Sequence, residues 1–401
     1  MPTELRKFDV IVLGAGAAGL MCAAIAGQRG RRVALLEHNG QVGRKILISG
    51  GGRCNFTNLH CGPANFLSEN MHFAKSALAL YEPRHFIELV ERYGIAWHEK
   101  KLGQLFCDHS ARAIVEMLLA ECDRAREMQG GVEIVLNACE IEVEGAAGGG
   151  FRMACSQGEF EAGALVVATG GLSIPKLGAT GLGYKLARQF GLRVVEPRPA
   201  LVPLVLGGDE AGWTELAGVA AEVEVRTAGA DCEALFRERM LVTHRGLSGP
   251  AVLQASSYWR AGEELVVDFA PEIEVLRALK EPGARRVEVA FRQALRELLP
   301  QRLAGFLADL GGPKGWSNAA LEACERRLHR WVFHPVKTEG FEKAEVTAGG
   351  VDTAGLHART MEVKSVPGLF FIGEAVDVTG QLGGFNFQWA WASGVSAGRA
   401  V

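Results

Sequence analysis

The sequence predicts an α/β protein in which a parallel sheet carries an inserted β-rich domain and a small helical subdomain. Three observations predict this fold class. An apolar run near the N-terminus leads into a glycine-rich turn and a helical stretch. Two later apolar runs also end in glycine, as buried strands of the same parallel sheet would. Between these two runs the pattern changes to alternating strands and then to helical spacing.

The N-terminal element carries a nucleotide-binding pattern. Phe8–Leu13 is apolar and rich in β-branched residues, as expected for a buried parallel strand. It leads into the G-x-G-x-x-G of Gly14–Gly19 and a helical stretch to Arg29, and a second strand, Arg32–Leu36, ends at Glu37. Strand, glycines, helix, strand and acid at these distances predict a dinucleotide-binding, Rossmann-like fold of the glutathione-reductase type.

Each part of this pattern has a physical role. Gly14 makes the tight turn, Gly16 lets a pyrophosphate approach the backbone, and Gly19 lets the helix pack on the strand. The free amides and the positive dipole end of the helix favour the diphosphate. Glu37 is placed to accept hydrogen bonds from ribose hydroxyls, and its carboxylate would repel the 2′-phosphate of NADP.

Two later segments favour FAD over NAD. Leu165–Gly171 is a strand that ends in A-T-G-G, and Pro367–Glu374 is a strand that ends in G-E. Both resemble signals of flavoproteins with two dinucleotide-binding domains, in which the later one places a carboxylate near the ribityl chain. Most such proteins have Asp after the glycine, so Glu374 and the nearby Asp377 are both candidates here. No second G-x-G-x-x-G follows an apolar strand, so we expect no dedicated NAD(P)H domain.

The C-terminal segment reads as a glycine loop, Gly380–Gly384, that opens a final helix at Phe385. The amides of that helix terminus would face the pyrimidine edge of the isoalloxazine and stabilise the negative charge of reduced flavin. Trp389 and Trp391 are interpreted as core aromatics.

Longer motifs resemble one family along nearly the whole chain. They are Arg44–Asn58 (RKILISGGGRCNFTN), Thr243–Pro250 (THRGLSGP), Val346–Val351 (VTAGGV), Thr360–Glu362 (TME) and Gly383–Ala390 (GGFNFQWA). Together they strongly resemble the bacterial BaiN/YhiN-type flavoproteins, known as NAD(P)/FAD-dependent oxidoreductases. The resemblance implies FAD and a three-part architecture, with NAD(P)H as a candidate transient electron donor. It does not settle the substrate.

The glycine-dense stretch Ser49–Asn55 would let the backbone run close under a planar ligand. Ser49 is a candidate hydrogen-bonding partner near flavin N5, and Asn55 is a candidate for orienting a substrate. Both residues equally suit a loop that braces itself. For Cys54 we favour an inert thiol over a redox role, because no partner cysteine is near in sequence.

The expected cofactor-binding residues lie at the glycine turn, after the second strand, in the Arg44–Asn58 motif and at the later strand ends. They are Gly14, Gly16, Ala17, Ala18, Gly19, Glu37, His38, Gly43, Arg44, Lys45, Ser49, Gly50, Gly51, Asn55, Thr169, Gly170, Gly373, Glu374, Asp377, Gly383, Gly384, Phe385 and Asn386. No metal site or disulfide framework is expected, because the cysteines are odd in number and form no C-x-x-C.

The chain is divided into 1–195 (first segment of the FAD-binding domain), 196–272 (inserted β-rich substrate domain), 273–335 (helical subdomain) and 336–401 (return to the FAD-binding domain). Residues 132–144 are expected to form strands of a small sheet beneath the adenine. Because ligand clefts usually form at domain interfaces, we expect the substrate between the FAD domain and the insert.

His244 is the candidate acid/base among the side chains, because histidine titrates near neutral pH. It lies at the expected end of a strand, before a helix that should begin near Pro250, and Arg245 beside it is suited to hold an anion. The alternative is that His244 hydrogen-bonds the backbone and braces this loop.

The sequence therefore predicts an FAD-dependent oxidoreductase that moves a hydride between flavin N5 and a small organic substrate, as an oxidase or as an NAD(P)H-linked reductase. One alternative is a folate/FAD-dependent RNA-modifying flavoprotein, which is supported by 11 Lys and Arg against 7 Asp and Glu in residues 273–330. Another is a flavin-binding protein without turnover. The net charge of -3 argues against nucleic-acid and membrane partners. The cysteine pattern favours the cytoplasm.

Overall fold

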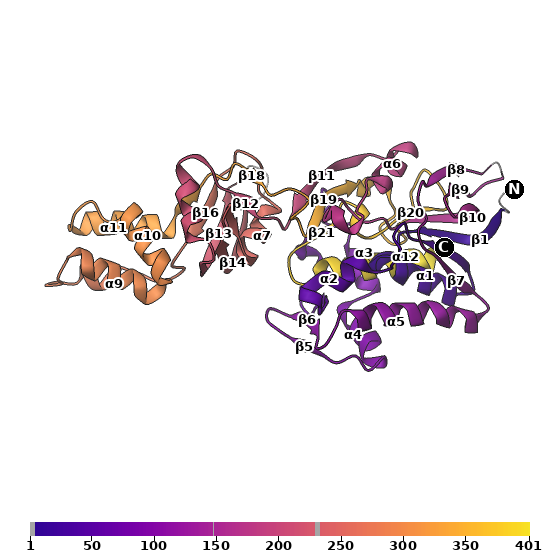
Figure 1. Cartoon of the computed structure of the whole chain (residues 1–401), viewed down its shortest axis with the longest axis horizontal. Helices are drawn as coiled ribbons and strands as arrows, with labels where there is room; N and C mark the ends of the chain where they lie inside the picture. Colours follow the sequence, from indigo (N-terminus) through magenta and orange to yellow (C-terminus); the bar gives the residue numbers. More distant parts are fainter. Residues whose placement is uncertain (1–4, 147, 229–232) are drawn as a thin grey trace. The chain divides into compact units, whose positions relative to one another are not determined.

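The computed structural model describes residues 5–146, 148–228 and 233–401, which fold into two compact units (Figure 1). Unit 1 is Met1–Arg198 with Val346–Val401, and unit 2 is Pro199–Glu345. Unit 2 is thus inserted into unit 1. The sequence-based boundaries after residues 195 and 335 lie three and ten residues before the observed divisions.

Unit 1 is built on a seven-stranded sheet in the order β7-β2-β1-β10-β9-β8, with β20 also pairing with β10. Five of the strands run parallel to their neighbours, and β8 and β9 form an antiparallel hairpin on the first half of β10. The bounds are β1 (Arg6–Leu13), β2 (Arg32–Leu36), β7 (Gly131–Val135), β8 (Glu142–Gly145), β9 (Phe151–Cys155), β10 (Gly158–Val167) and β20 (Leu369–Phe371). The predicted fold class is confirmed.

One strand lies elsewhere than the sequence indicated. Residues 132–144 were expected in a small separate sheet, but β7 pairs in parallel with β2 at the edge of the main sheet. Of the strands within residues 132–144, β8 is the one that pairs in the antiparallel hairpin with β9. The alternation of side chains in residues 132–144 suits a strand of the main sheet as well as one of a small separate sheet. Which sheet the strand joins therefore depends on partners distant in sequence.

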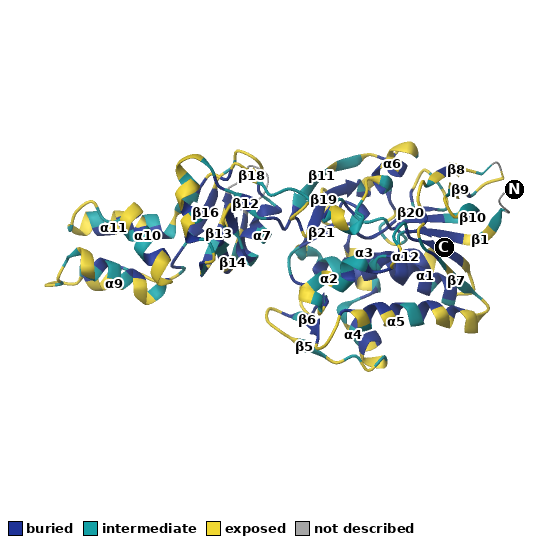
Figure 2. Cartoon of the chain, in the orientation of Figure 1, coloured by how far each residue is buried: buried dark blue, intermediate teal, exposed yellow. Residues whose placement is uncertain are grey.

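Helices cover the main sheet of unit 1, and the best-packed pair is α1 (Ala17–Gln28) against α12 (Phe385–Ala400). A Cβ on Gly394 would lie 2.6 Å from Ala18 O, so this glycine permits the close approach of the two helices. The other helices are α2 (Arg44–Gly52), α3 (Lys75–Leu80), α4 (Pro83–Arg92), α5 (Arg112–Asp123) and α6 (Leu182–Gln189). In Figure 2, buried residues follow the central strands, α1 and α12.

Three small sheets complete unit 1. They are β5 (Trp97–Glu99) with β6 (Gln104–Cys107) and β3 (Asn55–Asn58), then β4 (Phe66–Leu67) with β21 (Thr379–Gly380), and β11 (Val194–Ala200) with β19 (Val346–Val351). The last pair joins the two chain segments that lead into and out of the insert.

Unit 2 is an antiparallel sheet in the order β17-β16-β13-β14-β15-β12-β18, with α7 packed on β13 and β14 and the remaining helices gathered near one edge. The bounds are β12 (Leu204–Val205), β13 (Ala220–Ala228), β14 (Glu233–Val242), β15 (Gly246–Ser248), α7 (Pro250–Ser256), β16 (Leu265–Asp268), α8 (Arg277–Lys280), α9 (Glu288–Leu298), α10 (Gln301–Gly311), α11 (Asn318–His329), β17 (Trp331–Phe333) and β18 (Lys337–Thr338).

The sheet and the helices of unit 2 share one hydrophobic core. Val267 from β16, Phe291 from α9 and Leu321 from α11 are all buried in it. The β-rich and helical parts that the sequence separated therefore stabilise one another. Among the residues described, no helix combines the length and the apolar character needed to cross a membrane.

Candidate functional site

The glycine turn after β1 is tight on one side and open on the other. A Cβ on Gly14 would lie 2.5 Å from Ala168 O, and one on Gly19 would lie 1.8 Å from Gly14 O. A Cβ on Gly16 would meet nothing within 4 Å. The backbone at Gly16 therefore borders open space at the N-terminus of α1, where the helix amides and dipole favour an anion.

Glu37 braces this turn from the end of β2. Its buried carboxylate accepts hydrogen bonds from Ala15 N at 2.9 Å and from Asn39 N at 3.0 Å. His38 Nδ1 lies 3.1 Å from the same carboxylate, and Arg44 Nη1 donates to Asn39 Oδ1 at 2.5 Å. Glu37, the residue predicted to bind the ribose, thus lies at the glycine turn, in a polar cluster that also includes the start of α2.

The Ser49–Asn55 loop breaks α2. Ser49 leaves the helical conformation, and Gly50 and Gly51 have φ values of 56° and 68°. A Cβ on Gly50 would lie 2.9 Å from Asn55 N, whereas one on Gly51 would meet nothing within 4 Å. The loop therefore packs on one side against its own chain and is open at Gly51, a shape that suits a planar ligand. Ser49 Oγ donates to Ile46 O at 2.7 Å, so it also braces the break in the helix.

Cys54 lies within this loop and is fully buried, with a φ of 49°. Burial raises the pKa of its thiol above the ordinary value, which disfavours the reactive thiolate at neutral pH. This environment supports the interpretation of Cys54 as an inert thiol.

The same loop is joined to the start of α12. In the amide orientation that satisfies both atoms, Asn55 donates to Leu105 O at 3.2 Å and accepts from Gly384 N at 3.3 Å. Thr57 Oγ1 donates to Gln388 Oε1 at 2.6 Å. Two of the signature motifs, more than 300 positions apart, therefore lie against each other, and Asn55 acts here as a brace between them.

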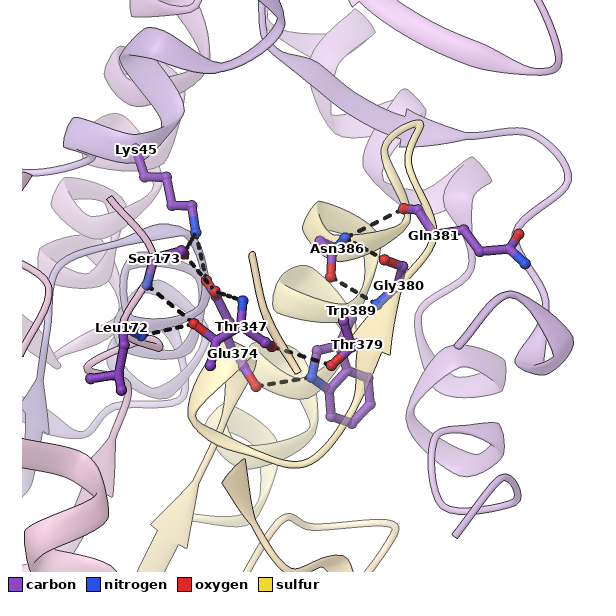
Figure 3. A network of polar contacts seen from close by, with 11 residues as sticks. Lys45, Leu172, Ser173, Thr347, Glu374, Thr379, Gly380, Gln381, Asn386 and Trp389 are labelled. Carbon is purple, nitrogen blue, oxygen red and sulfur yellow. Dashed lines mark hydrogen bonds and ion pairs between the residues drawn. The ribbon is translucent and has the colours of Figure 1, made fainter. Parts of the chain in front are cut away.

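A second network gathers residues from four segments (Figure 3). Glu374 Oε2 accepts from Lys45 Nζ at 2.8 Å, and Glu374 Oε1 accepts from Ser173 Oγ at 3.0 Å and from Thr347 N at 2.8 Å. Thr347 Oγ1 in turn accepts from Leu172 N at 2.8 Å. The A-T-G-G and G-E strand ends, β19 and α2 thus meet at the Glu374 carboxylate.

Asp377, the other candidate carboxylate, has different partners. It is buried and accepts from Glu69 N at 2.9 Å and from Ser68 Oγ at 3.4 Å. Burial raises the pKa of this carboxyl above its ordinary value. Asp377 therefore holds the segment after β4, whereas Glu374 lies in the network with Lys45.

Three further predicted residues, Gly373, Asn386 and Gly170, also lie in unit 1 at turns or helix ends. Gly373 approaches the N-terminal turn of α1, since a Cβ on it would lie 2.9 Å from Ala18 Cβ. Asn386 pins the loop before α12 by accepting from Gly380 N and donating to Gly380 O, both at 2.8 Å (Figure 3). Gly170 has a φ of 74° and open space beside it.

Among the residues that the structure describes, five buried hydroxyls lack a hydrogen-bond partner, and two of them, Thr169 Oγ1 and Tyr184 OH, belong to the A-T-G-G turn and to α6. A Cβ on Gly183 would lie 2.4 Å from Thr169 Oγ1, so α6 passes directly beside the A-T-G-G turn. Buried hydroxyls normally have partners, and a bound ligand would provide them. Tyr184 was not among the predicted residues; the glycine run Gly178–Gly183 before α6 is the signal in the sequence that could have indicated a close approach here. These hydroxyls and the open space at Gly16 and Gly51 fit a bound dinucleotide.

His244 lies in unit 2, in the turn between β14 and β15, and is exposed. Thr243 braces that turn, because its Oγ1 accepts from Arg245 N and from Gly246 N, both at 3.2 Å. The hydrogen bonds that hold the loop thus come from Thr243. Arg245 pairs with Glu339 at 3.5 Å.

Residues 8–400 match the family model described as HI0933-like protein Rossmann domain. The chain belongs to this family. The predicted resemblance to BaiN/YhiN-type flavoproteins is thereby confirmed. Within the described ranges, no group of three or more His, Cys, Asp or Glu side chains is placed to hold a metal ion.

Curated relatives match end to end. The chain is 47% identical over 395 residues to a protein of Escherichia coli (strain K12) named ribosomal RNA dihydrouridine synthase, covering 97% of this chain and 96% of that protein. A Haemophilus influenzae protein of the same name is 43% identical, with 98% of each covered. A Clostridium scindens protein named 3-dehydro-bile acid delta(4,6)-reductase is 29% identical, covering 97% of this chain and 98% of that protein.

Among solved structures, a quinol-fumarate reductase with menaquinol molecules aligns with a TM-score of 0.50 and 16% identity, covering 99% of this chain and 71% of the other. At this identity the similarity concerns the fold.

Proposed function

We propose that this protein is an FAD-dependent reductase that converts uridine in ribosomal RNA to dihydrouridine. The observation that carries the proposal is its 47% identity, over 97% of the chain, to the Escherichia coli protein that bears that name. From the sequence alone, a small organic substrate was the first expectation and RNA was the alternative. The names of the two curated relatives favour RNA, in spite of the acidic net charge.

FAD is the proposed cofactor. The open backbone at Gly16 and the N-terminus of α1 would hold the diphosphate, and Glu37 the ribose of the adenosine. The Lys45–Glu374 network would lie at the ribityl chain, and the left-handed loop at Gly51 would lie under the ring. The amides at the start of α12 would stabilise negative charge on the reduced ring.

The reaction adds two hydrogens across the C5=C6 bond of uracil. Reduced flavin, when bound, supplies one of them as a hydride from N5. The other is a proton for the neighbouring carbon, and we propose His244 as its source, since its ring is exposed and histidine is a common general acid in enzymes. An NAD(P)H-type reductant supplies the electrons. Folate is not required, because reduction of a double bond transfers no carbon.

The test uses the purified full chain loaded with FAD, an NAD(P)H-type reductant and ribosomal RNA from cells that lack the protein. We expect nucleoside mass spectrometry to find dihydrouridine in the RNA after incubation and none without the reductant. RNA that gains no dihydrouridine, although the flavin is fully reduced, would refute the proposed substrate.

A small enone is the second candidate substrate, and the bile-acid reductase relative favours it. Both names describe reduction of carbon–carbon double bonds, so the hydride step would be shared. Steady-state reoxidation of the reduced flavin by a steroid enone, compared with reoxidation by ribosomal RNA under anaerobic conditions, separates the two. A faster reaction with the enone alone would favour a small-molecule reductase.

A further inference from the structure

Unit 2 is divided in charge. Its helical part, residues 273–330, has 11 Lys and Arg against 7 Asp and Glu, whereas the rest of the unit, residues 199–272 and 331–345, has 7 against 15. The two parts share one core, so the basic excess belongs to one side of a single folded unit. The acidic balance of the whole chain therefore conceals a local basic surface of the kind that a polyanion needs.

An open groove lies between α8 and α11 on this helical part. Its volume is about 340 Å³, and its lining is formed by Lys280, Glu322, Glu325, Arg326, His329 and Arg330. We call it the α8–α11 groove.

Some of the charges in the groove are used within the protein. Glu325 is buried and accepts from Val275 N at 2.7 Å and from Leu276 N at 2.8 Å, which fixes the chain before α8. Lys280 lies 2.9 Å from Glu274 and 3.6 Å from Glu325. The charges of Lys280, Glu274 and Glu325 therefore stabilise the fold, and together they leave no net positive charge for a ligand.

Arg326 and Arg330 differ from Lys280. Both are exposed, and neither has a carboxylate within ion-pair distance in the described part of the chain. Arg326 lies in the last turn of α11 and Arg330 follows directly after the helix, and both side chains line the groove. Arg292 on α9 is the opposite case, since both Glu288 and Asp309 pair with its guanidinium.

We infer that the α8–α11 groove binds the phosphate backbone of RNA through Arg326 and Arg330. The inference rests on the proposed function, which supplies RNA as the partner. Guanidinium groups bind phosphate through paired N–H donors, and an arginine without an internal carboxylate needs to break no ion pair to do so. Phosphate contacts of this kind position RNA without reading its sequence.

A competing explanation is that cations at the end of α11 offset the helix dipole, since Arg326, Arg327 and His329 lie in its last turn. That role would change stability and leave RNA binding unaltered. The salt dependence of binding separates the two explanations, because each phosphate contact releases counterions.

The experiment measures binding of a fluorescently labelled ribosomal RNA fragment to the FAD-loaded full chain over a series of salt concentrations. The test variant is Arg326→Gln/Arg330→Gln. The matched control is Arg237→Gln/Arg292→Gln, which removes the same total charge from arginines that are already paired with Glu272, Glu288 and Asp309. Flavin content and the thermal midpoint establish that both variants are folded.

We expect the test variant to lower the slope of log affinity against log salt by roughly 2, about 1 for each arginine, and the control to keep the parent slope. A slope unchanged in the test variant, or lowered equally in the control, would overturn the inference.

The dihydrouridine assay of the parent protein is read separately. If the parent forms dihydrouridine while the slope does not depend on these arginines, the surface is wrong and the function stands. If the slope depends on them and no dihydrouridine forms, the function fails and the surface stands.

Discussion

Lys45 Nζ lies 2.8 Å from Glu374 Oε2, although 329 positions separate the two residues in the sequence. Ser173 Oγ and Thr347 N donate to the other oxygen of the same carboxylate. One partly exposed side chain therefore holds together α2, the turn after β10 and the start of β19. This junction is built from three of the segments that the sequence marked as cofactor-binding, and it gives a first prediction.

Glu374→Ala is expected to lower the free energy of unfolding by about 1–3 kcal/mol, because Thr347 N, Ser173 and Lys45 lose their acceptor. Glu374→Gln keeps an oxygen for Thr347 N and should cost less. The Lys45 side chain is 37% exposed, so the ion pair itself contributes little. Urea unfolding of the apoproteins measures both values, and equal losses in the two variants would contradict this account.

Substitutions at Gly16 and at Gly19 are expected to impair different properties, FAD binding at Gly16 and stability at Gly19. Gly16→Val adds a side chain in open space, so the apoprotein should keep its thermal midpoint and lose FAD binding. Gly19→Ala places a Cβ 1.8 Å from Gly14 O and should destabilise the apoprotein by about 1–3 kcal/mol or more. Thermal unfolding and FAD titration are measured on both. Stoichiometric FAD in the Gly16 variant would remove the pyrophosphate assignment.

Glu37→Ala is expected to weaken FAD affinity by about 1.5–3 kcal/mol, the range for hydrogen bonds to a charged group. Part of this loss should come from the turn itself, since Ala15 N loses its acceptor. Glu37→Gln, which retains an acceptor oxygen, separates the two contributions. FAD titration of the apoproteins gives the values, and an unchanged dissociation constant in the alanine variant would move the ribose contact elsewhere.

The burial of Asp377 predicts a specific pH dependence of the protein's stability. Burial raises the pKa of this carboxyl above its ordinary value of 3.8, so the native state holds the proton more tightly than the unfolded chain. The resulting stability is complete below pH 3.8 and is lost as pH rises through the folded pKa. Asp377→Asn keeps an oxygen for Glu69 N and should gain stability relative to the parent as pH rises from acidic to neutral. Urea midpoints across this range test the sign, and the opposite trend would refute it.

His244→Asn is expected to leave stability unchanged, because Thr243 makes the hydrogen bonds of the turn. If His244 supplies the proton, reoxidation of the reduced flavin by substrate should be slower in this variant than in the parent. Thr243→Val is the structural control and should lower the thermal midpoint. A His244 variant that matches the parent rate at every pH would assign the proton to solvent.

Local patterns predicted the parts of the fold that depend on neighbours in sequence. The G-x-G-x-x-G of Gly14–Gly19 and the buried strand before it were predicted because turn geometry and strand burial are set within a few residues. Pro300 likewise separates α9 from α10 by a local effect, since proline cannot continue a helix interior.

Only the tertiary structure decided which of these segments meet. The sequence by itself determined the fold class, the family and most of the candidate cofactor residues, because glycine spacing and apolar runs carry that information. It left Glu374 and Asp377 as equal candidates, and their different partners, Lys45 and Glu69, lie more than 300 positions away. It also could not reveal that Arg326 has no carboxylate partner within the described ranges while Arg292 is paired, since pairing depends on which helices pack together. Contacts of such range follow from the packing of the whole chain, and no local periodicity encodes them.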